Sequence, residues 1–150
     1  MQWGATKAVR LGLTRDVGEG LVMTVQFGRV VPVFRIFSLD KAREFYLDFL
    51  GFKVDWEHRF EPDLPVYMQV SRAGLAFHLS EHHGDGTPGS TVHVEMTGVA
   101  ELHAELTAKH YRYLRPGLEK QPWGATTVAV TDPFMNHILF SESDPKGGDS

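Results

Sequence analysis

The alternation of apolar and polar residues predicts short strands in the middle of the chain. Apolar side chains take every second position in 75–79 and in 92–96. This is the period of a strand that buries one face. The apolar set is expected to face the core, which places His78 and His93 on the opposite, concave face. Both histidines are therefore candidates for contact with a ligand.

Two longer segments carry apolar residues three or four positions apart, which is the period of an amphipathic helix. The first runs from Leu39 to Phe49 and the second from Val99 to Leu106. Gly51 is expected to end the first helix. Strands are predicted on either side of these helices: 52–57, 66–71 and 75–80 after the first, 91–96 before the second, and 125–131 and 138–141 after it.

The order of strand and helix is used twice. Phe34 recurs as Val94, sixty positions later, and the first helix has its counterpart in the second. Each copy is expected to have the order βαβββ, the first at about 29–81 and the second at about 90–142. The glycine-rich stretch 82–89 lies between them as a linker. The sequence thus predicts an α+β fold built from two βαβββ repeats.

The same pattern predicts a single domain over residues 23–143. Residues 1–22 have no sustained helical or strand period, so we expect a flexible N-terminal extension, with Met23 as a candidate natural start. The polar residues 144–150 are expected to form a disordered tail. A chain of 150 residues with 42% hydrophobic content can bury a core as one domain.

Composition narrows the classes of function. The chain has no cysteine, which excludes disulfides and thiolate catalysis and favours a cytoplasmic location. It has no apolar run of the roughly 20 residues that span a bilayer, so no membrane partner is expected. The formal net charge of −4 argues against a nucleic-acid partner and mildly favours a cationic ligand.

The segment 119–124 holds a tryptophan at a bend. Pro122 fixes its own φ and Gly124 lets the backbone turn, so Trp123 is held between them. A large, rigid aromatic at a bend is a candidate ligand contact. For Trp123, and equally for Trp56 near the end of a predicted strand, the alternative is a core residue.

Several short motifs resemble those of one protein family. They are Phe45-Tyr46, Leu50-Gly51-Phe52, Gln121-Pro122-Trp123-Gly124, and Asp132-Pro133 followed by Asn136. From Val31 to Glu142 the chain is similar to the bleomycin resistance proteins of the glyoxalase/bleomycin resistance/dioxygenase (vicinal oxygen chelate) superfamily. The resemblance implies that the two repeats form a curved mixed sheet with the helices on its outer face.

The enzymes of this superfamily usually hold a divalent metal with histidine, glutamine or glutamate side chains on the concave face. By the resemblance, the four positions correspond here to Val31, His78, Thr91 and Leu139. Hydrocarbon side chains have no lone pair, and a threonine hydroxyl does not replace an imidazole or a carboxylate. We therefore expect no metal, no other cofactor and no catalytic residue, and a binding protein rather than an enzyme.

A displaced metal site is an alternative. His93 and His137 lie two residues from the positions that the resemblance implies, and they share their face with His78. Two residues along a strand span about 6.6 Å, whereas a metal site tolerates shifts of about a few tenths of an ångström. Exposed or groove-lining histidines that bind no metal are therefore favoured.

The resemblance implies a function in drug binding. Bleomycin resistance proteins form homodimers whose shared clefts sequester a cationic glycopeptide antibiotic with a planar end, without altering it. The ligand-binding residues would then be Asp55, Trp56, Phe60, His78, His93 and Trp123. Two alternatives stay open: a metal-dependent enzyme of the superfamily, such as a lyase, isomerase or thiol transferase, and a binder of an unrelated small metabolite.

Overall fold

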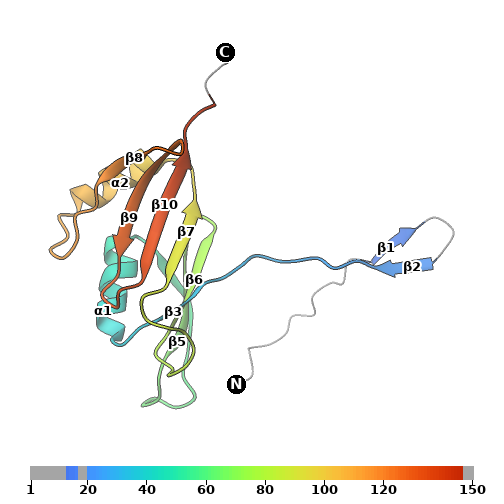
Figure 1. Ribbon diagram of the computed structural model, residues 1–150. Helices are drawn as coiled ribbons and strands as arrows, with labels where there is room; N and C mark the ends of the chain where they lie inside the picture. Colours follow the sequence, from blue (N-terminus) through green and yellow to red (C-terminus); the bar gives the residue numbers. More distant parts are fainter. Residues whose placement is uncertain (1–12, 17–19, 147–150) are drawn as a thin grey trace. The chain divides into compact units, whose positions relative to one another are not determined.

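The computed structural model describes most of the chain (Figure 1). It covers residues 13–16 and 20–146, with side chains described from residue 24 onward. The chain forms two compact units, 1–30 and 31–150. The end of the predicted disordered tail, at 147–150, lies outside the described residues.

The first unit contains one pair of strands in its described part. These strands are β1 (Leu13–Asp16) and β2 (Gly20–Met23), which run antiparallel. The sequence pattern predicts a flexible extension over residues 1–22. That extension stays a prediction, since residues 1–12 and 17–19 lie outside the described part.

The second unit contains two βαβββ repeats, which can be followed in Figure 1. The first repeat consists of β3 (Val33–Arg35), α1 (Leu39–Arg43), its π-helical continuation η1 (Glu44–Phe49), β4 (Lys53–His58), β5 (Tyr67–Arg72) and β6 (Leu75–Ser80). The second consists of β7 (Thr91–Glu95), α2 (Val99–Ala108), β8 (Leu118–Gln121), β9 (Ala125–Thr131) and β10 (His137–Ser143). The predicted α+β fold with two repeats is confirmed.

The strands of the second unit form two four-stranded mixed sheets. Their orders are β3-β6-β5-β4 and β7-β10-β9-β8. In each sheet the first strand of the repeat runs parallel to the last, and the other neighbours are antiparallel. The apolar pattern does not indicate β8, because Leu118 is the only apolar residue in this largely exposed edge strand.

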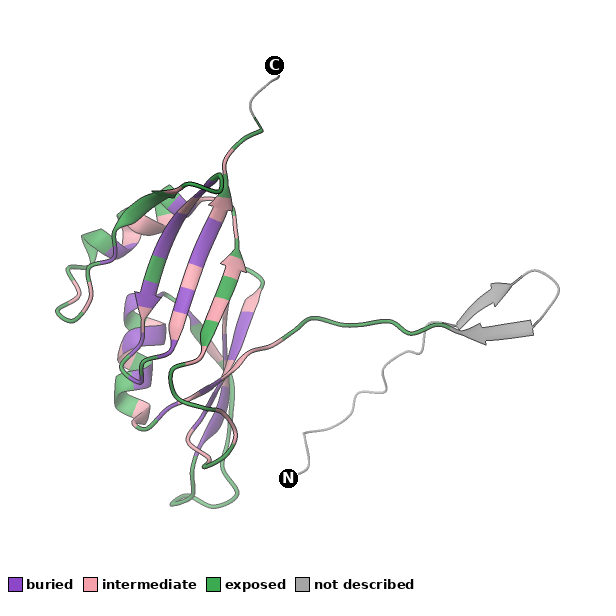
Figure 2. Ribbon diagram, viewed as in Figure 1, coloured by how far each residue is buried: buried purple, intermediate pink, exposed green. Residues whose placement is uncertain are grey.

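One hydrophobic core joins the helices to one face of each sheet, as the buried positions in Figure 2 show. The rings of Phe34 and Phe77 lie 5.0 Å apart, and Tyr46 of η1 lies 6.4 Å from Phe34. Val128 and Ile138 bring the second sheet into the same core. We refer to the face of each sheet turned away from this core as its open face.

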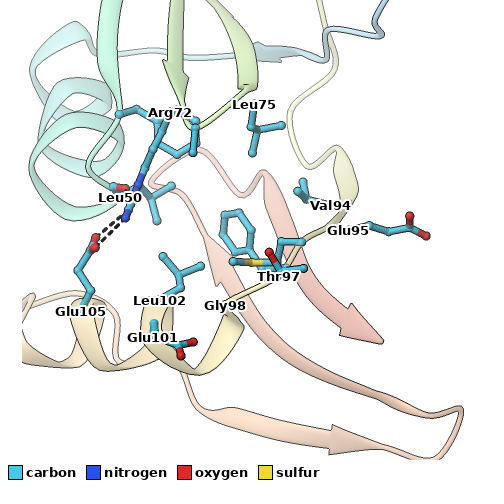
Figure 3. Close-up of a pocket in the computed structure, with 14 residues that line it drawn as sticks. Leu50, Arg72, Leu75, Val94, Glu95, Thr97, Gly98, Glu101, Leu102 and Glu105 are labelled. Atoms are coloured by element: carbon cyan, nitrogen blue, oxygen red, sulfur yellow. Dashed lines mark hydrogen bonds and ion pairs between the residues drawn. The ribbon is translucent and has the colours of Figure 1, made fainter. Parts of the chain in front are cut away.

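An ion pair joins the two repeats where the first helical segment ends (Figure 3). Gly51 adopts a φ of +76°, which favours glycine. Arg72 donates to the Leu50 carbonyl at 2.7 Å and makes two hydrogen bonds of 2.7 Å to Glu105 of α2. The hydrogen bonds from Arg72 lower the pKa of Glu105. A pocket of about 490 Å³, lined by apolar side chains and by charged ones that include Arg72 and Glu105, lies beside this pair.

Candidate functional site

Three rings cluster on the open face of the first sheet. The indole of Trp56 lies nearly parallel to the phenol ring of Tyr67, with an interplanar angle of 9° and 5.9 Å between centroids. His78 meets both rings at a steep angle, 5.2 Å from each. Tyr67 is buried, whereas Trp56 keeps 41% of its surface exposed. The interpretation of Trp56 as a core residue is therefore wrong.

A chain of hydrogen bonds fixes the polar groups of this cluster. Gln69 donates from Nε2 to the Asp55 carboxylate at 3.0 Å, so its carbonyl oxygen faces Nε2 of His78, also at 3.0 Å. In this network His78 carries its proton on Nε2. Its Nδ1 accepts a hydrogen bond of 2.8 Å from the Tyr67 hydroxyl. Both ring nitrogens are thus engaged, and His78 supports the wall of the site.

A β-bulge in β4 puts Trp56 on the open face. Val54 lies opposite Val70, and both pack in the core. Strict alternation would return Trp56 to the side of Val54, two positions earlier. The register instead shifts between these two residues, so that Trp56 lies opposite Gln69 and Asp55 is the extra residue. The indole thereby joins the open face.

The loop between the repeats folds over one end of this face. Ser80 donates to Asp85 at 2.8 Å, and a Cβ atom at Gly86 would stand 3.2 Å from the Val33 carbonyl oxygen. Burial, and secondly the charge of Asp85, raise the pKa of Tyr67 to about 12. The Tyr67 phenol thus stays protonated at neutral pH and remains a hydrogen-bond donor.

Tyr67 is expected to make the stability of the protein fall at high pH. Its pKa is about 12 in the fold and about 10 in an unfolded chain, so the unfolded state loses this proton first. The stabilisation of the folded state by the protonated Tyr67 phenol is complete below about pH 10 and is lost as the pH rises through about 12. Tyr67→Phe should therefore reduce the fall in unfolding free energy between about pH 9 and pH 11.5 by about 1 to 2 kcal/mol, measured by urea unfolding. An equally steep fall in the variant would contradict this role.

The other predicted contact residues lie elsewhere. Phe60 is exposed in the loop between β4 and β5. His93 is exposed on the open face of the second sheet, opposite Leu139. Trp123 lies at the turn between β8 and β9 with 63% of its surface exposed, so its interpretation as a core residue is also wrong. The structure therefore brings together Asp55, Trp56 and His78 on the first sheet.

The positions that the resemblance assigns to a metal do not form a ligand set. Within the part of the chain that the structure describes, no three histidine, cysteine, aspartate or glutamate side chains gather closely enough to hold a metal ion. The displaced site of three histidines is thus not formed there. His137 is instead hydrogen-bonded to Thr131 at 2.9 Å.

Two βαβββ repeats with mixed four-stranded sheets are the fold of glyoxalases and bleomycin resistance proteins. Residues 16–147 match a family model described as glyoxalase superfamily protein, and the chain belongs to that superfamily. None of the curated proteins compared with the chain matches it. In the described residues, no helix has the length and apolar character needed to cross a membrane.

Solved structures with this fold include drug binders and a glyoxalase-related enzyme. A bleomycin-binding protein complexed with bleomycin is 19% identical with a TM-score of 0.61, over 79% of this chain and 100% of that one. The bleomycin-binding protein of bleomycin-producing Streptomyces verticillus, complexed with copper(II)-bleomycin, is 26% identical with a TM-score of 0.60. The match covers 81% of this chain and 100% of that one. A glyoxalase-related enzyme from Clostridium phytofermentans is 19% identical with a TM-score of 0.61. The match covers 79% of this chain and 97% of that one.

Proposed function

We propose that this protein binds and sequesters, without altering it, a cationic glycopeptide antibiotic of the bleomycin type that ends in a planar group. The observation that carries the proposal is the ring cluster, in which Trp56 stacks on Tyr67 and stays 41% exposed. An exposed indole held parallel to a second ring is suited to stacking on a flat ligand group. The likeness to two bleomycin-binding proteins supports the same ligand class.

Electrostatic attraction adds to stacking. An indole attracts a cationic group over its face by about 0.5 to 2 kcal/mol, and Asp55 places a carboxylate next to Trp56. The charge of Asp55 is opposed by Lys53, whose ammonium lies 3.8 Å away. Because Lys53 is largely exposed, this opposition is weakened by solvent. The net charge of −4 also favours a cation at longer range.

The proposal includes a homodimer in which two protomers complete each cleft. Trp56 and His78 belong to the first sheet, whereas His93 belongs to the second and Trp123 to the turn between its strands β8 and β9. A cleft between the first sheet of one protomer and the second sheet of its partner would bring both groups onto one ligand. Sedimentation at micromolar concentration is expected to give twice the chain mass of 16.8 kDa. A species of the chain mass alone would rule out the shared cleft.

Isothermal titration calorimetry with metal-free bleomycin tests the proposal. The parent is expected to bind the drug, and Trp56→Ala should weaken binding by about 1 to 2 kcal/mol, the size of a lost aromatic contact. Tyr113→Ala is the matched control, because Tyr113 is 61% exposed but lies in the segment after α2, away from the ring cluster. Equal losses in the two variants would remove the ring cluster from the binding site.

Elemental analysis of the same preparation separates the alternatives. No stoichiometric transition metal is expected. About one Zn, Ni, Fe or Mn per chain, lost on His78→Ala, would favour a metal-dependent enzyme of the superfamily. A parent that binds neither bleomycin nor a metal would favour an unrelated small metabolite as the ligand.

A further inference from the structure

A groove of about 670 Å³ lies between the start of the first helix, the segment after α2 and the turn between β9 and β10. In Figure 1 this turn lies beside α1. The rings of Phe37 and Phe134 lie 6.1 Å apart across two of these segments. Aromatic side chains from all three segments line the groove: Phe37, Phe45, Tyr111, Tyr113 and Phe134. None of them belongs to the Trp56 cluster.

The rim of this aromatic groove is unusually exposed for its apolar character. Phe37 is 59% exposed, and Tyr113 and Met135 are each 61% exposed. These side chains come from three segments that are far apart in the sequence, yet they line one depression. A single exposed apolar residue needs no explanation, but several around one hollow indicate a binding surface.

The turn that carries Met135 is held rigidly. The Asp132 carboxylate accepts hydrogen bonds from the backbone N–H groups of Phe134 and Asn136, each at 2.8 Å. Met135 itself adopts a φ of +69°, a left-handed conformation that is unfavourable for a residue with a Cβ atom. The turn thus fixes an exposed methionine at the rim, so a ligand would meet a preformed wall.

The charges around the groove favour an anion. The ring faces of the rim already carry the chain's own cations: Arg35 stands 4.7 Å from the centroid of Phe37, and Lys41 stands 5.0 Å from that of Tyr113. Arg112 stands 5.6 Å from the same Tyr113 ring. A further cation would be repelled by these three groups, whereas an anion would be attracted to them.

The acidic groups nearby do not cancel this preference. Asp132 lines the groove but is buried, and its carboxylate is occupied by hydrogen bonds from within its own turn and from Tyr46. Glu44 lies 3.8 Å from Lys41 and also accepts a hydrogen bond from Tyr111. The Lys41 side chain remains 49% exposed and stays available to a ligand in the groove.

We propose that the aromatic groove is a second binding site, which takes a small planar aromatic acid. The ring of the ligand lies among Phe37, Tyr113 and Met135, and its anionic group lies at Lys41. This site is separate from the open face, and its ligand has the opposite charge to the one proposed there.

Two fluorescent probes of matched shape test the proposal. They are 8-anilinonaphthalene-1-sulfonate and N-phenyl-1-naphthylamine, which has the same rings without the sulfonate. The sulfonate is expected to bind the full-length chain more tightly than the amine. Lys41→Gln should weaken sulfonate binding by about threefold to tenfold, the range for one partly screened charge contact, and leave amine binding unchanged. Lys120→Gln, which removes an equally charged side chain that is 77% exposed and paired with Asp144, is the matched control.

A second pair of variants tests the apolar rim. Tyr113→Ser and Met135→Gln are each expected to weaken binding of both probes, with melting temperatures recorded for each variant. Sulfonate binding that survives Lys41→Gln and both rim variants would overturn the proposal, as would binding that is lost on Trp56→Ala. Sedimentation showing that either rim variant converts a dimer to a monomer would also overturn it, because the groove would then be an interface between copies of the chain.

Discussion

Asp132→Ala is expected to lower the free energy of unfolding by about 3 to 5 kcal/mol. The carboxylate is almost fully buried and accepts hydrogen bonds from the Tyr46 hydroxyl at 2.7 Å and from the Asn136 side chain at 2.9 Å. It also accepts hydrogen bonds from two backbone N–H groups of its own turn. Burial, and then the charge of Asp132, raise the pKa of Tyr46 well above its usual value, which keeps this hydroxyl a donor. The alanine variant leaves the Tyr46 hydroxyl and the two backbone N–H groups without this acceptor, while the Asn136 side chain keeps its hydrogen bond to the Arg35 carbonyl.

Chemical denaturation of the parent and two variants measures this effect. Tyr46→Phe is the matched control, because it removes one of the hydrogen bonds without emptying the turn, and should cost about 1 to 2 kcal/mol. A loss below about 1 kcal/mol for Asp132→Ala would show that water or a rearranged turn replaces the carboxylate.

Trp123→Ala is expected to weaken bleomycin binding by about 1 to 3 kcal/mol, which is the size of a good aromatic stack or an interface hot spot. The indole is 63% exposed at the turn between β8 and β9, so its loss should leave thermal stability nearly unchanged. A buried tryptophan would instead cost about 3 to 5 kcal/mol of folding free energy on the same substitution. Melting curves and calorimetry on the one variant therefore separate a ligand contact from a structural residue.

Two outcomes would count against a binding role for Trp123. One is a folded variant that binds the drug as tightly as the parent, which would leave the second sheet outside the cleft. The other is a large loss of stability, which would show that the turn needs the indole for folding. Trp123→Phe should recover part of the binding, since a smaller ring still stacks.

The fold follows from the sequence where strands alternate strictly. In β6 the buried residues Phe77 and Leu79 flank His78, and in β7 the apolar set packs on the core while His93 stays exposed. This alternation, together with the helical spacing from Leu39 to Phe49, was enough to predict both repeats. It could not show that the first helix continues as η1, because the spacing of a few buried rings fits an α-helix and a π-helical turn alike.

The site follows from the sequence only in part. Val66, Met68 and Val70 are buried and alternate with Tyr67 and Gln69, so the signal that places Tyr67 and Gln69 on the open face was present. Sequence reasoning missed them because tyrosine also fits an apolar position in such a pattern. The hydrogen bond between Gln69 and Asp55 could not be predicted at all, since it depends on a shift of register that residue types do not reveal.

The bulge at Asp55 makes the chemistry of the open face depend on the register of β4 as well as on its composition. If Asp55 took a regular place in the ladder, Trp56 would return to the side of Val54 and turn toward the helices, whereas deleting Asp55 would leave Trp56 opposite Gln69 on the open face. With Asp55 in the ladder, Glu57, which is now paired with Arg43, would move to the open face in place of Trp56. Loss of the bulge without a change of length is thus a route by which a domain of this fold exchanges an aromatic contact for an acidic one, while its side chains stay the same.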